Sequence, residues 1–193
     1  KTLSVPMISL NSAVEMTPEY FDFIDASLVS MQTRIRSDAR FYFKGSTGLD
    51  IEATSSLFNF QSIENEIAGL DFLGEGQVWA RVQGPYDDIK IFGNADLKKF
   101  RFENYRIGNV ATKMSYINNK LILKSAHITK GRTNLRGKFS LHFKSKGKYK
   151  KAPLIMLADF KIVRGYVEDL QNIIPKNPSS GVMDVIKSLP LSG

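Results

Sequence analysis

The sequence predicts a mainly β protein: a long, curved antiparallel sheet with one apolar face, and one or two short helices near the C-terminal end. Apolar and polar residues alternate with a period of two in about six or seven consecutive segments between residues 77 and 163. Each segment ends at Gly, Asn or Pro residues that are typical of turns. Apolar residues at helical spacing follow Gly165, and Pro175 and Pro178 end that run.

Strands before residue 77 are predicted from their aromatic and branched residues. Residues 1–18 show no sustained period, and residues 61–70 fit a short helix or a turn. Breaks are expected near Ser37–Asp38 and at residues 45–48. The predicted strands are Tyr20–Ile24, Ala26–Ile35, Arg40–Lys44 and Leu49–Phe60.

From residue 77 onward the turn chemistry divides the pattern into strands. Pro85 fixes its backbone angle beside Gly84, and Asn118–Asn119 tolerate the left-handed conformations of a tight hairpin. A bulge is expected near Lys98–Lys99, and residues 121–128 carry apolar residues on both sides. The predicted strands cover residues 77–83, 89–102, 110–116, 121–128, 135–143 and 154–163, followed by helices at about 166–174 and 182–189.

Composition narrows the function classes. The chain has 193 residues and no Cys, so it can bury a core without disulfides and cannot use thiolate catalysis or Cys-based zinc sites. No segment approaches the roughly 18–20 apolar residues of a membrane-spanning helix, and no secretion signal opens the sequence. Because it begins at Lys1 and ends on Leu-Pro-Leu-Ser-Gly, we interpret it as a segment of a larger protein.

Positive charge is concentrated in one stretch. Residues 104–158 contain 13 Lys and Arg and no Asp or Glu, whereas the remaining residues contain 14 basic and 19 acidic ones. The whole net charge of +8 therefore arises in that stretch. Such a field favours anionic partners, either phosphate headgroups or nucleic acid, and the alternative is a solvated rim with a basic loop.

A sheet with one apolar face must fold over on itself, pack against helices or hold a ligand. Helices are few in this sequence, and covering about 15 apolar side chains at roughly 2 kcal/mol each would contribute on the order of 30 kcal/mol. Curvature leaves either a filled core or an open trough, and the pattern leaves both open. The candidate groove-lining residues are Val78, Ala80, Val82, Ile89, Ile91, Leu97, Leu121, Leu123, Leu135, Phe139, Leu141, Phe143, Met156 and Phe160.

The layout of residues 84–143 resembles a repeat of the TamB and AsmA-like superfamily. A Gly-Pro-acidic turn enters a strand, and a segment similar to LxLxxAxIxxGxxxLxGxFxL closes the unit, here from Leu121 to Leu141. Residues 158–175 (ADFKIVRGYVEDLQNIIP) resemble the strand and helix of that family, and the final LPLSG resembles the start of its next repeat. The resemblance covers about half the chain.

This resemblance implies a groove-shaped sheet of the "β-taco" kind, in a periplasmic protein anchored in the inner membrane. Residues 1–193 would be one such segment, with N-terminal strands at 1–75, the clearest repeat at 76–165, and a helical cap and the beginning of the next repeat at 166–193. The family is linked to phospholipid transport towards the outer membrane. For TamB it is also linked to outer-membrane protein assembly with a barrel partner.

Both roles suit the pattern. Acyl chains would replace water along the apolar face, each buried methylene contributing about 0.8 kcal/mol, while headgroups stay at the open edge near Arg136, Lys138 and Lys144. Alternatively, an exposed strand edge would pair with an unfolded barrel strand. The sequence does not separate the two.

Other function classes find less support. We find no GxSxG, GxxxxGK[ST] or HExxH motif, so no enzyme activity, cofactor or metal is expected, and His127 and His142 lie on separate predicted strands. A nucleic-acid-binding domain is the main rival, but Phe139 alternates with Arg136 and Lys138, which places stacking and phosphate contacts on opposite faces. A closed, purely structural β-scaffold is a second rival.

Overall fold

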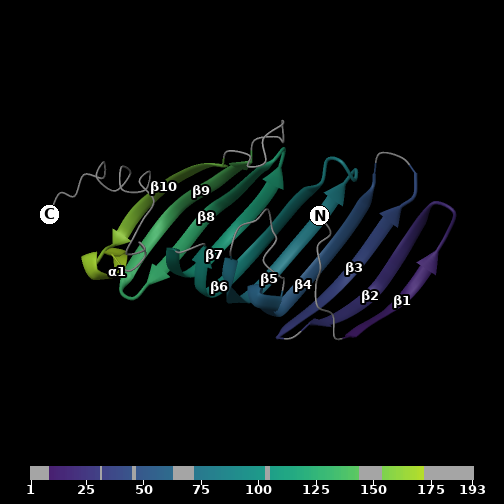
Figure 1. The fold of residues 1–193 in the computed structure, drawn as a ribbon, viewed down its shortest axis with the longest axis horizontal. Helices are drawn as coiled ribbons and strands as arrows, with labels where there is room; N and C mark the ends of the chain where they lie inside the picture. The colour runs from purple at the N-terminus through teal and green to yellow at the C-terminus, as the bar shows by residue number, and fades with distance from the viewer. Residues whose placement is uncertain are drawn as a thin grey trace.

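In a computed structural model of the protein, ten strands form a single antiparallel sheet in chain order (Figure 1). The structure describes residues 9–30, 32–44, 47–62, 72–102, 105–143 and 154–171. The strands are β1 (Ser9–Met16), β2 (Tyr20–Ser30), β3 (Thr33–Tyr42), β4 (Leu49–Asn59), β5 (Phe72–Gly84), β6 (Lys90–Phe102), β7 (Tyr105–Ile117), β8 (Lys120–Lys130), β9 (Thr133–Phe143) and β10 (Leu154–Arg164).

The sheet is curved and does not close (Figure 1). Within the described residues, β1 pairs only with β2, and β10 pairs only with β9. A single turn of 3-10 helix, η1 (Phe60–Ser62), follows β4, and one short helix, α1 (Val167–Gln171), follows β10. The predicted fold class is confirmed. The predicted second helix, the basic loop after residue 143 and most of the ambiguous segment 61–70 lie outside the described residues.

The register gives the sheet one continuous apolar face. Directly paired residues of neighbouring strands point to the same side, so a row of pairs can be followed from strand to strand. One row crosses all ten strands, and nine of its ten residues are apolar without a polar group. It consists of Val14, Phe23, Ala39, Ile51, Val82, Ile91, Tyr116, Leu121, Leu141 and Met156. We call this side the apolar face and the opposite side the polar face.

Bulges explain segments in which the sequence alternation fails. Ser125 has a left-handed backbone (φ 51°), and the pairing of β8 with β9 shifts between Leu123 and Ala126. The extra residue brings Ala126 and Ile128 to the same face as Leu121 and Leu123. Of the apolar residues that the sequence placed on both sides of residues 121–128, all but Ile122 therefore share one face. The bulge predicted near Lys98–Lys99 is confirmed, since Lys99 has φ 51°.

The predicted break at Ser37–Asp38 is wrong. Both residues lie inside β3, where Ser37 pairs with Ala26 of β2 and Asp38 with Glu52 of β4. The Asp38 carboxylate accepts a 2.8 Å hydrogen bond from the backbone N–H of Asp25, the left-handed bulge residue of β2. A polar pair that looks like a turn in sequence thus supports a bulge in the neighbouring strand. The chain reverses instead between Ser30 and Thr33.

Strand β1 is a second correction, because residues 1–18 gave no strand signal. The side of β1 that belongs to the apolar face carries Leu10, Val14 and Met16, but Ser12 interrupts this row and Ala13 lies on the opposite side, which obscures the alternation in the sequence. Strand β5 also begins earlier than predicted, at Phe72.

The register of β1–β4 recurs in β7–β10. Met16 pairs with Phe21 and Tyr116 with Leu121, an offset of 100 residues. The shift between Asn11 and Ala13 recurs between Ala111 and Lys113, and the left-handed Asp25 recurs as Ser125. The two four-strand units therefore share pairing and bulges, although their sequences differ at most positions.

The offset also extends to the last strand of each unit. Arg34 pairs with Leu57, and Asn134 pairs with Arg164, so β10 is offset from β4 by 107 residues. The offset is larger here because the chain between paired residues of β9 and β10 is seven residues longer than the chain between the equivalent residues of β3 and β4. The elements that follow, η1 and α1, occupy matching positions after their strands. The units β1–β4 and β7–β10 are thus structural duplicates.

A buried threonine closes each unit in the same way. The Thr33 hydroxyl, 1% exposed, accepts a 2.9 Å hydrogen bond from the backbone N–H of Asn59. The Thr133 hydroxyl, 0% exposed, accepts a 2.9 Å bond from the backbone N–H of Tyr166, which occupies the equivalent position. Each hydroxyl holds the end of the unit's last strand against the start of its third.

Replacing either threonine by valine is expected to lower the free energy of unfolding by about 1–3 kcal/mol, because a buried backbone N–H loses its acceptor while side-chain volume is kept. Urea denaturation followed by circular dichroism measures this loss. Thr54→Val, at an exposed position of β4, is the matched control and should change stability by less than about 0.5 kcal/mol. Equal effects at all three positions would contradict the role of these hydroxyls.

Candidate functional site: the apolar face

The predicted groove-lining residues are brought together on the apolar face. All of them except Ile89 lie in strands, and the pairing of β5 through β10 places them on the same side of the sheet. Ile89 immediately precedes β6, which begins at Lys90. Phe143 and Met156 belong to this face by their backbone register. Whether these residues contact a ligand remains a prediction.

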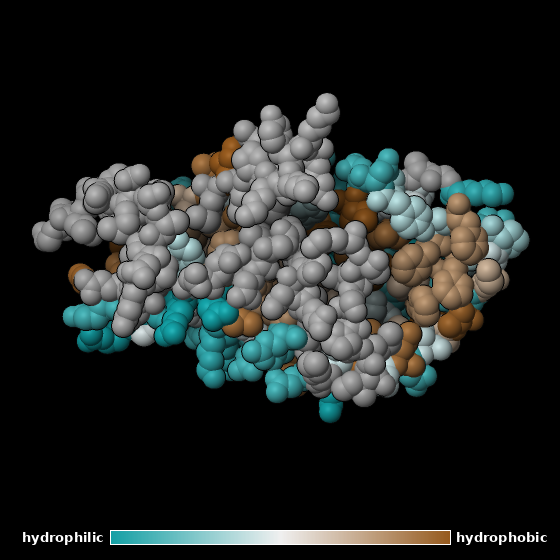
Figure 2. Space-filling model, viewed as in Figure 1, coloured by the Kyte–Doolittle hydropathy of each residue, from teal (hydrophilic) through white to brown (hydrophobic). Residues whose placement is uncertain are grey.

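Exposure of the apolar face changes across the sheet. In the central strands and β9, Leu97, Val110 and Leu141 are 4%, 3% and 1% exposed. On β1 at one edge, Val14 and Met16 are 56% and 72% exposed, and on β10 at the other edge Ile162 is 52% exposed. Figure 2 shows hydrophobic side chains gathered over the β1–β3 end of the viewed face. Large apolar side chains in water at both edges favour contact with further apolar material.

An aromatic cluster occupies one end of the apolar face. Phe60 stacks with Phe72 at 5.8 Å between ring centroids, and Phe72 stacks with Phe100 at 6.3 Å. Phe58 meets Phe60 edge to face at 5.0 Å, and Phe102 lies 5.2 Å from Phe72. This cluster was not among the sites predicted from the sequence, although the Phe-x-Phe spacing at residues 58–60 and 100–102 indicates it.

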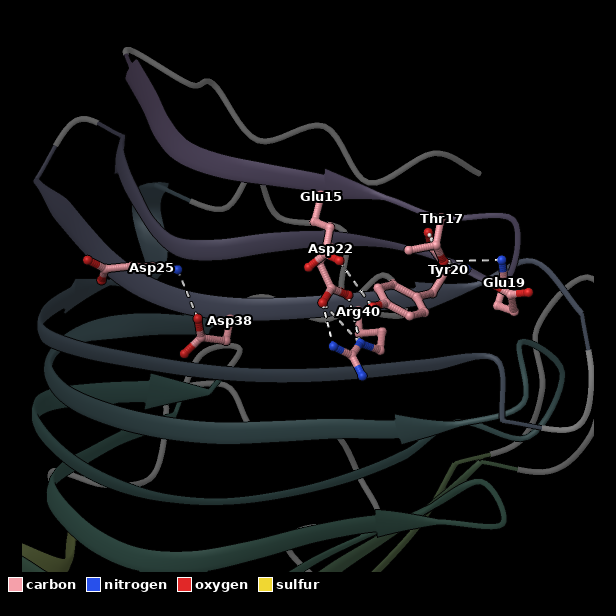
Figure 3. Close-up of polar contacts among 8 residues, drawn as sticks. All are labelled: Glu15, Thr17, Glu19, Tyr20, Asp22, Asp25, Asp38 and Arg40. Atoms are coloured by element: carbon pink, nitrogen blue, oxygen red, sulfur yellow. Dashed lines mark hydrogen bonds and ion pairs between the residues drawn. The ribbon is translucent and has the colours of Figure 1, made fainter.

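Two arginines on the polar face of the first half of the sheet are bound by aspartates. Arg40 of β3 binds Asp22 of β2 through Nε at 2.8 Å and Nη2 at 2.6 Å, and its guanidinium lies 4.2 Å from the centroid of the Tyr20 ring (Figure 3). Arg81 of β5 binds Asp50 of β4 in the same two-pronged way, at 3.0 and 2.8 Å. These arginines are engaged by carboxylates of neighbouring strands.

The bidentate bond from Arg40 lowers the pKa of Asp22 below its ordinary value of 3.8, against an opposing effect of burial. A carboxyl whose pKa is lower in the folded chain stabilises the fold above its ordinary pKa, and this contribution disappears as the pH falls through the folded value. We therefore expect the stability gap between the wild type and Asp22→Asn to narrow as the pH is lowered from 6 towards 3. Urea midpoints at stepped pH measure it, and a constant gap would contradict the assignment.

The basic residues predicted to face lipid headgroups lie on the polar face. Arg136 and Lys138 point away from Phe139 because they alternate with it along β9. They border a shallow depression of about 610 Å³ together with Asp159 and Lys161 of β10. Lys144 lies outside the described residues. A headgroup at the edge of the apolar face is therefore separated from Arg136 and Lys138 by the thickness of the sheet.

Two further features bear on the site. Among the described residues, no group of three or more His, Cys, Asp and Glu side chains is placed to hold a metal ion. In the same part of the chain, no helix has both the length and the apolar character needed to span a bilayer.

Comparison with protein-family models, with curated protein sequences and with solved structures finds no match to this chain.

Proposed function

We propose that this chain is a segment of a TamB-like or AsmA-like envelope protein that shields phospholipid acyl chains as they pass between the inner and outer membranes. The observation that carries the proposal is the row of apolar residues that crosses all ten strands of an unclosed sheet. An acyl chain laid across such a row leaves water at about 0.8 kcal/mol per methylene and needs no polar partner. The proposal includes a periplasmic location, with the full-length protein anchored in the inner membrane.

Lipid that copurifies with the protein tests the proposal. We expect native mass spectrometry of the protein, purified in a mild detergent and then freed of it, to show added masses of phospholipid. Solvent extraction should release the same lipids. A protein that is consistently empty, after expression in cells with abundant phospholipid, would favour a structural scaffold and overturn the proposal.

A second candidate function is assembly of outer-membrane barrel proteins. It is favoured by the edge strands, because β1 and β10 are paired on one side only within the described chain. Unpaired backbone groups of such a strand can pair with an incoming strand. Photo-crosslinking in living cells separates the candidates: a crosslinker at Phe139 should capture lipid if the apolar face carries it, whereas one at Leu157 of β10 should capture a barrel protein if the edge is used.

Binding of nucleic acid is the alternative function, and it can be tested separately. Phe139 lies on the apolar face, whereas Arg136 and Lys138 lie on the polar face. A strand of nucleic acid would therefore meet the aromatic ring and the charges on opposite sides of β9. We expect labelled single-stranded DNA to show no strong salt-dependent binding, and a steep salt dependence of tight binding would revive this alternative.

A further inference from the structure

Four basic side chains line one pocket of about 370 Å³ where β6, β7 and β8 come together at one end of the sheet. They are Lys99 and Arg101 of β6, Arg106 of β7 and Lys130 of β8, and none of the described residues that line the pocket is acidic. We propose that this pocket binds a phosphate group. Its volume falls within the range of small-molecule sites, and arginine offers paired N–H donors that match phosphate oxygens.

Backbone irregularities build the pocket. The pairing of β6 with β7 shifts on both sides of Phe100, and left-handed Lys99 donates its backbone N–H to the Asn109 side-chain oxygen at 3.2 Å. Gly108 has φ +110°, and a Cβ there would lie 3.3 Å from Cβ and Cδ of Lys130 and would clash with the Thr129 carbonyl oxygen. Glycine at this position leaves room for the Lys130 stem to cross β7.

The pocket concentrates positive charge. Arg101 is the neighbour of Arg106 across β6 and β7. Within the described part of the chain, Lys99, Arg106 and Lys130 form no ion pair, whereas Arg40 and Arg81 each bind an aspartate. The carboxylate of Asp169 lies beside the pocket, against Gly131 of its lining, where it accepts hydrogen bonds from the backbone N–H of Arg132 at 2.8 Å and the Thr133 hydroxyl at 3.2 Å. A bound phosphate would offer Lys99, Arg106 and Lys130 an anionic partner.

The duplicated units show that the fold does not require a basic residue at the position of Lys130. Lys130 of the second unit occupies the position of Ser30 in the first. Ser30 pairs with Thr33 in the same way as Lys130 pairs with Thr133, so a serine at this position supports the same strand pairing. Paired lysines alone do not make a site either, since Lys113 and Lys124 pair across the same two strands on the exposed polar face without lining this pocket. The pocket differs from that pair because its basic residues line a concave surface.

The ligand class follows from what adjoins the pocket. Phe100 lines the pocket and also stacks in the aromatic cluster of the apolar face, so that a phosphate in the pocket can carry an apolar chain onto that face. If the phosphate belongs to a lipid headgroup, the proposal rests on the proposed function. If it belongs to a soluble phosphate ester, the proposal is independent of that function. Both sources present the same chemistry to the four basic residues.

The test compares two double variants that remove equal charge from the same two strands. Arg106→Gln with Lys130→Gln alters the pocket, and Lys113→Gln with Lys124→Gln alters the polar face. Binding of glycerol 3-phosphate is measured by calorimetry at fixed salt, and binding to phosphatidylcholine vesicles with and without phosphatidic acid by flotation. We expect the pocket variant to lose at least tenfold in affinity for one or both probes, and the control to stay within about twofold.

The outcomes are distinct. Loss of glycerol 3-phosphate binding alone identifies a soluble ester, and loss of vesicle binding alone identifies a headgroup. Equal losses in both variants would show a general charge effect and overturn the pocket, as would a wild type that binds neither probe. Phe139→Glu should retain glycerol 3-phosphate binding even if it abolishes lipid loading, so failure of this site and failure of the proposed function can be told apart.

Discussion

Phe139→Glu is expected to reduce copurified lipid, and the binding of a fluorescent fatty-acid probe, by tenfold or more. Phe139 pairs with Leu123 of β8 and Ala158 of β10 in the middle of the apolar face and is half-buried. A carboxylate there would have to lose its water when an acyl chain lies across it. Its desolvation costs more than the roughly 1.4 kcal/mol that corresponds to a tenfold loss.

Ser140→Glu is the matched control, because it adds the same charge one residue further along β9, on the opposite face. Ser140 pairs with Ile122 of β8 and Leu157 of β10. We expect it to leave lipid loading unchanged, provided that circular dichroism shows both variants to be folded. Equal loading of the folded Phe139→Glu protein and the wild type would remove the apolar face from the mechanism.

Gly137→Val is expected to cause the largest loss of stability, about 3 kcal/mol, and to weaken the pairing of β10 with β9. Gly137 pairs with Phe160, and a Cβ at this position would lie 2.7 Å from both the Cα and the Cδ1 atom of Phe160 and would clash with the Asp159 carbonyl oxygen. Two of these three atoms belong to the backbone, so the contact can be relieved only by moving β10. Urea denaturation measures the loss.

The duplicated unit supplies the control for this prediction. Ser37 occupies the position of Gly137 and pairs with Ala53, where the second unit has Phe160. Ser37→Val should therefore cost less than about 1 kcal/mol, since a small residue faces it. Adding Phe160→Ala to Gly137→Val should recover part of the loss by removing the ring contact. No recovery would mean that the backbone contacts alone account for the effect.

The fold class was predictable because the alternation survives wherever strands are regular. Residues 77–83 and 135–143 carry uninterrupted alternation, and the structure places their apolar residues on one face as the pattern requires. The pattern failed to assign faces where a bulge shifts its phase by one residue, as between Leu123 and Ala126, because alternation on the two sides of a bulge no longer matches. It also failed at Ser37–Asp38, where polar residues support a neighbouring strand instead of a turn.

The candidate site was predictable in part for the same reason. Membership of the apolar face follows from period two, so most of the predicted residues lie together. The basic pocket was not predictable, because Lys99, Arg106 and Lys130 are far apart in sequence and meet only through the register of three strands. The duplication was hidden too. Its units share a pattern of Ala26, Leu28, Thr33, Ile35 and Arg36 with Ala126, Ile128, Thr133, Leu135 and Arg136, which emerges only when the chain is compared with itself at an offset of 100.

Every strand of this sheet pairs with the strand next to it in sequence. The stability of such an arrangement is approximately a sum over adjacent hairpins, and no contact between distant parts of the chain has to form before the rest can fold. The molecule can therefore fray inwards from either outer strand while its middle stays intact. Because each strand contacts only its neighbours, whole units can be inserted during evolution. The length of the sheet can then change without any change to the existing strand pairings.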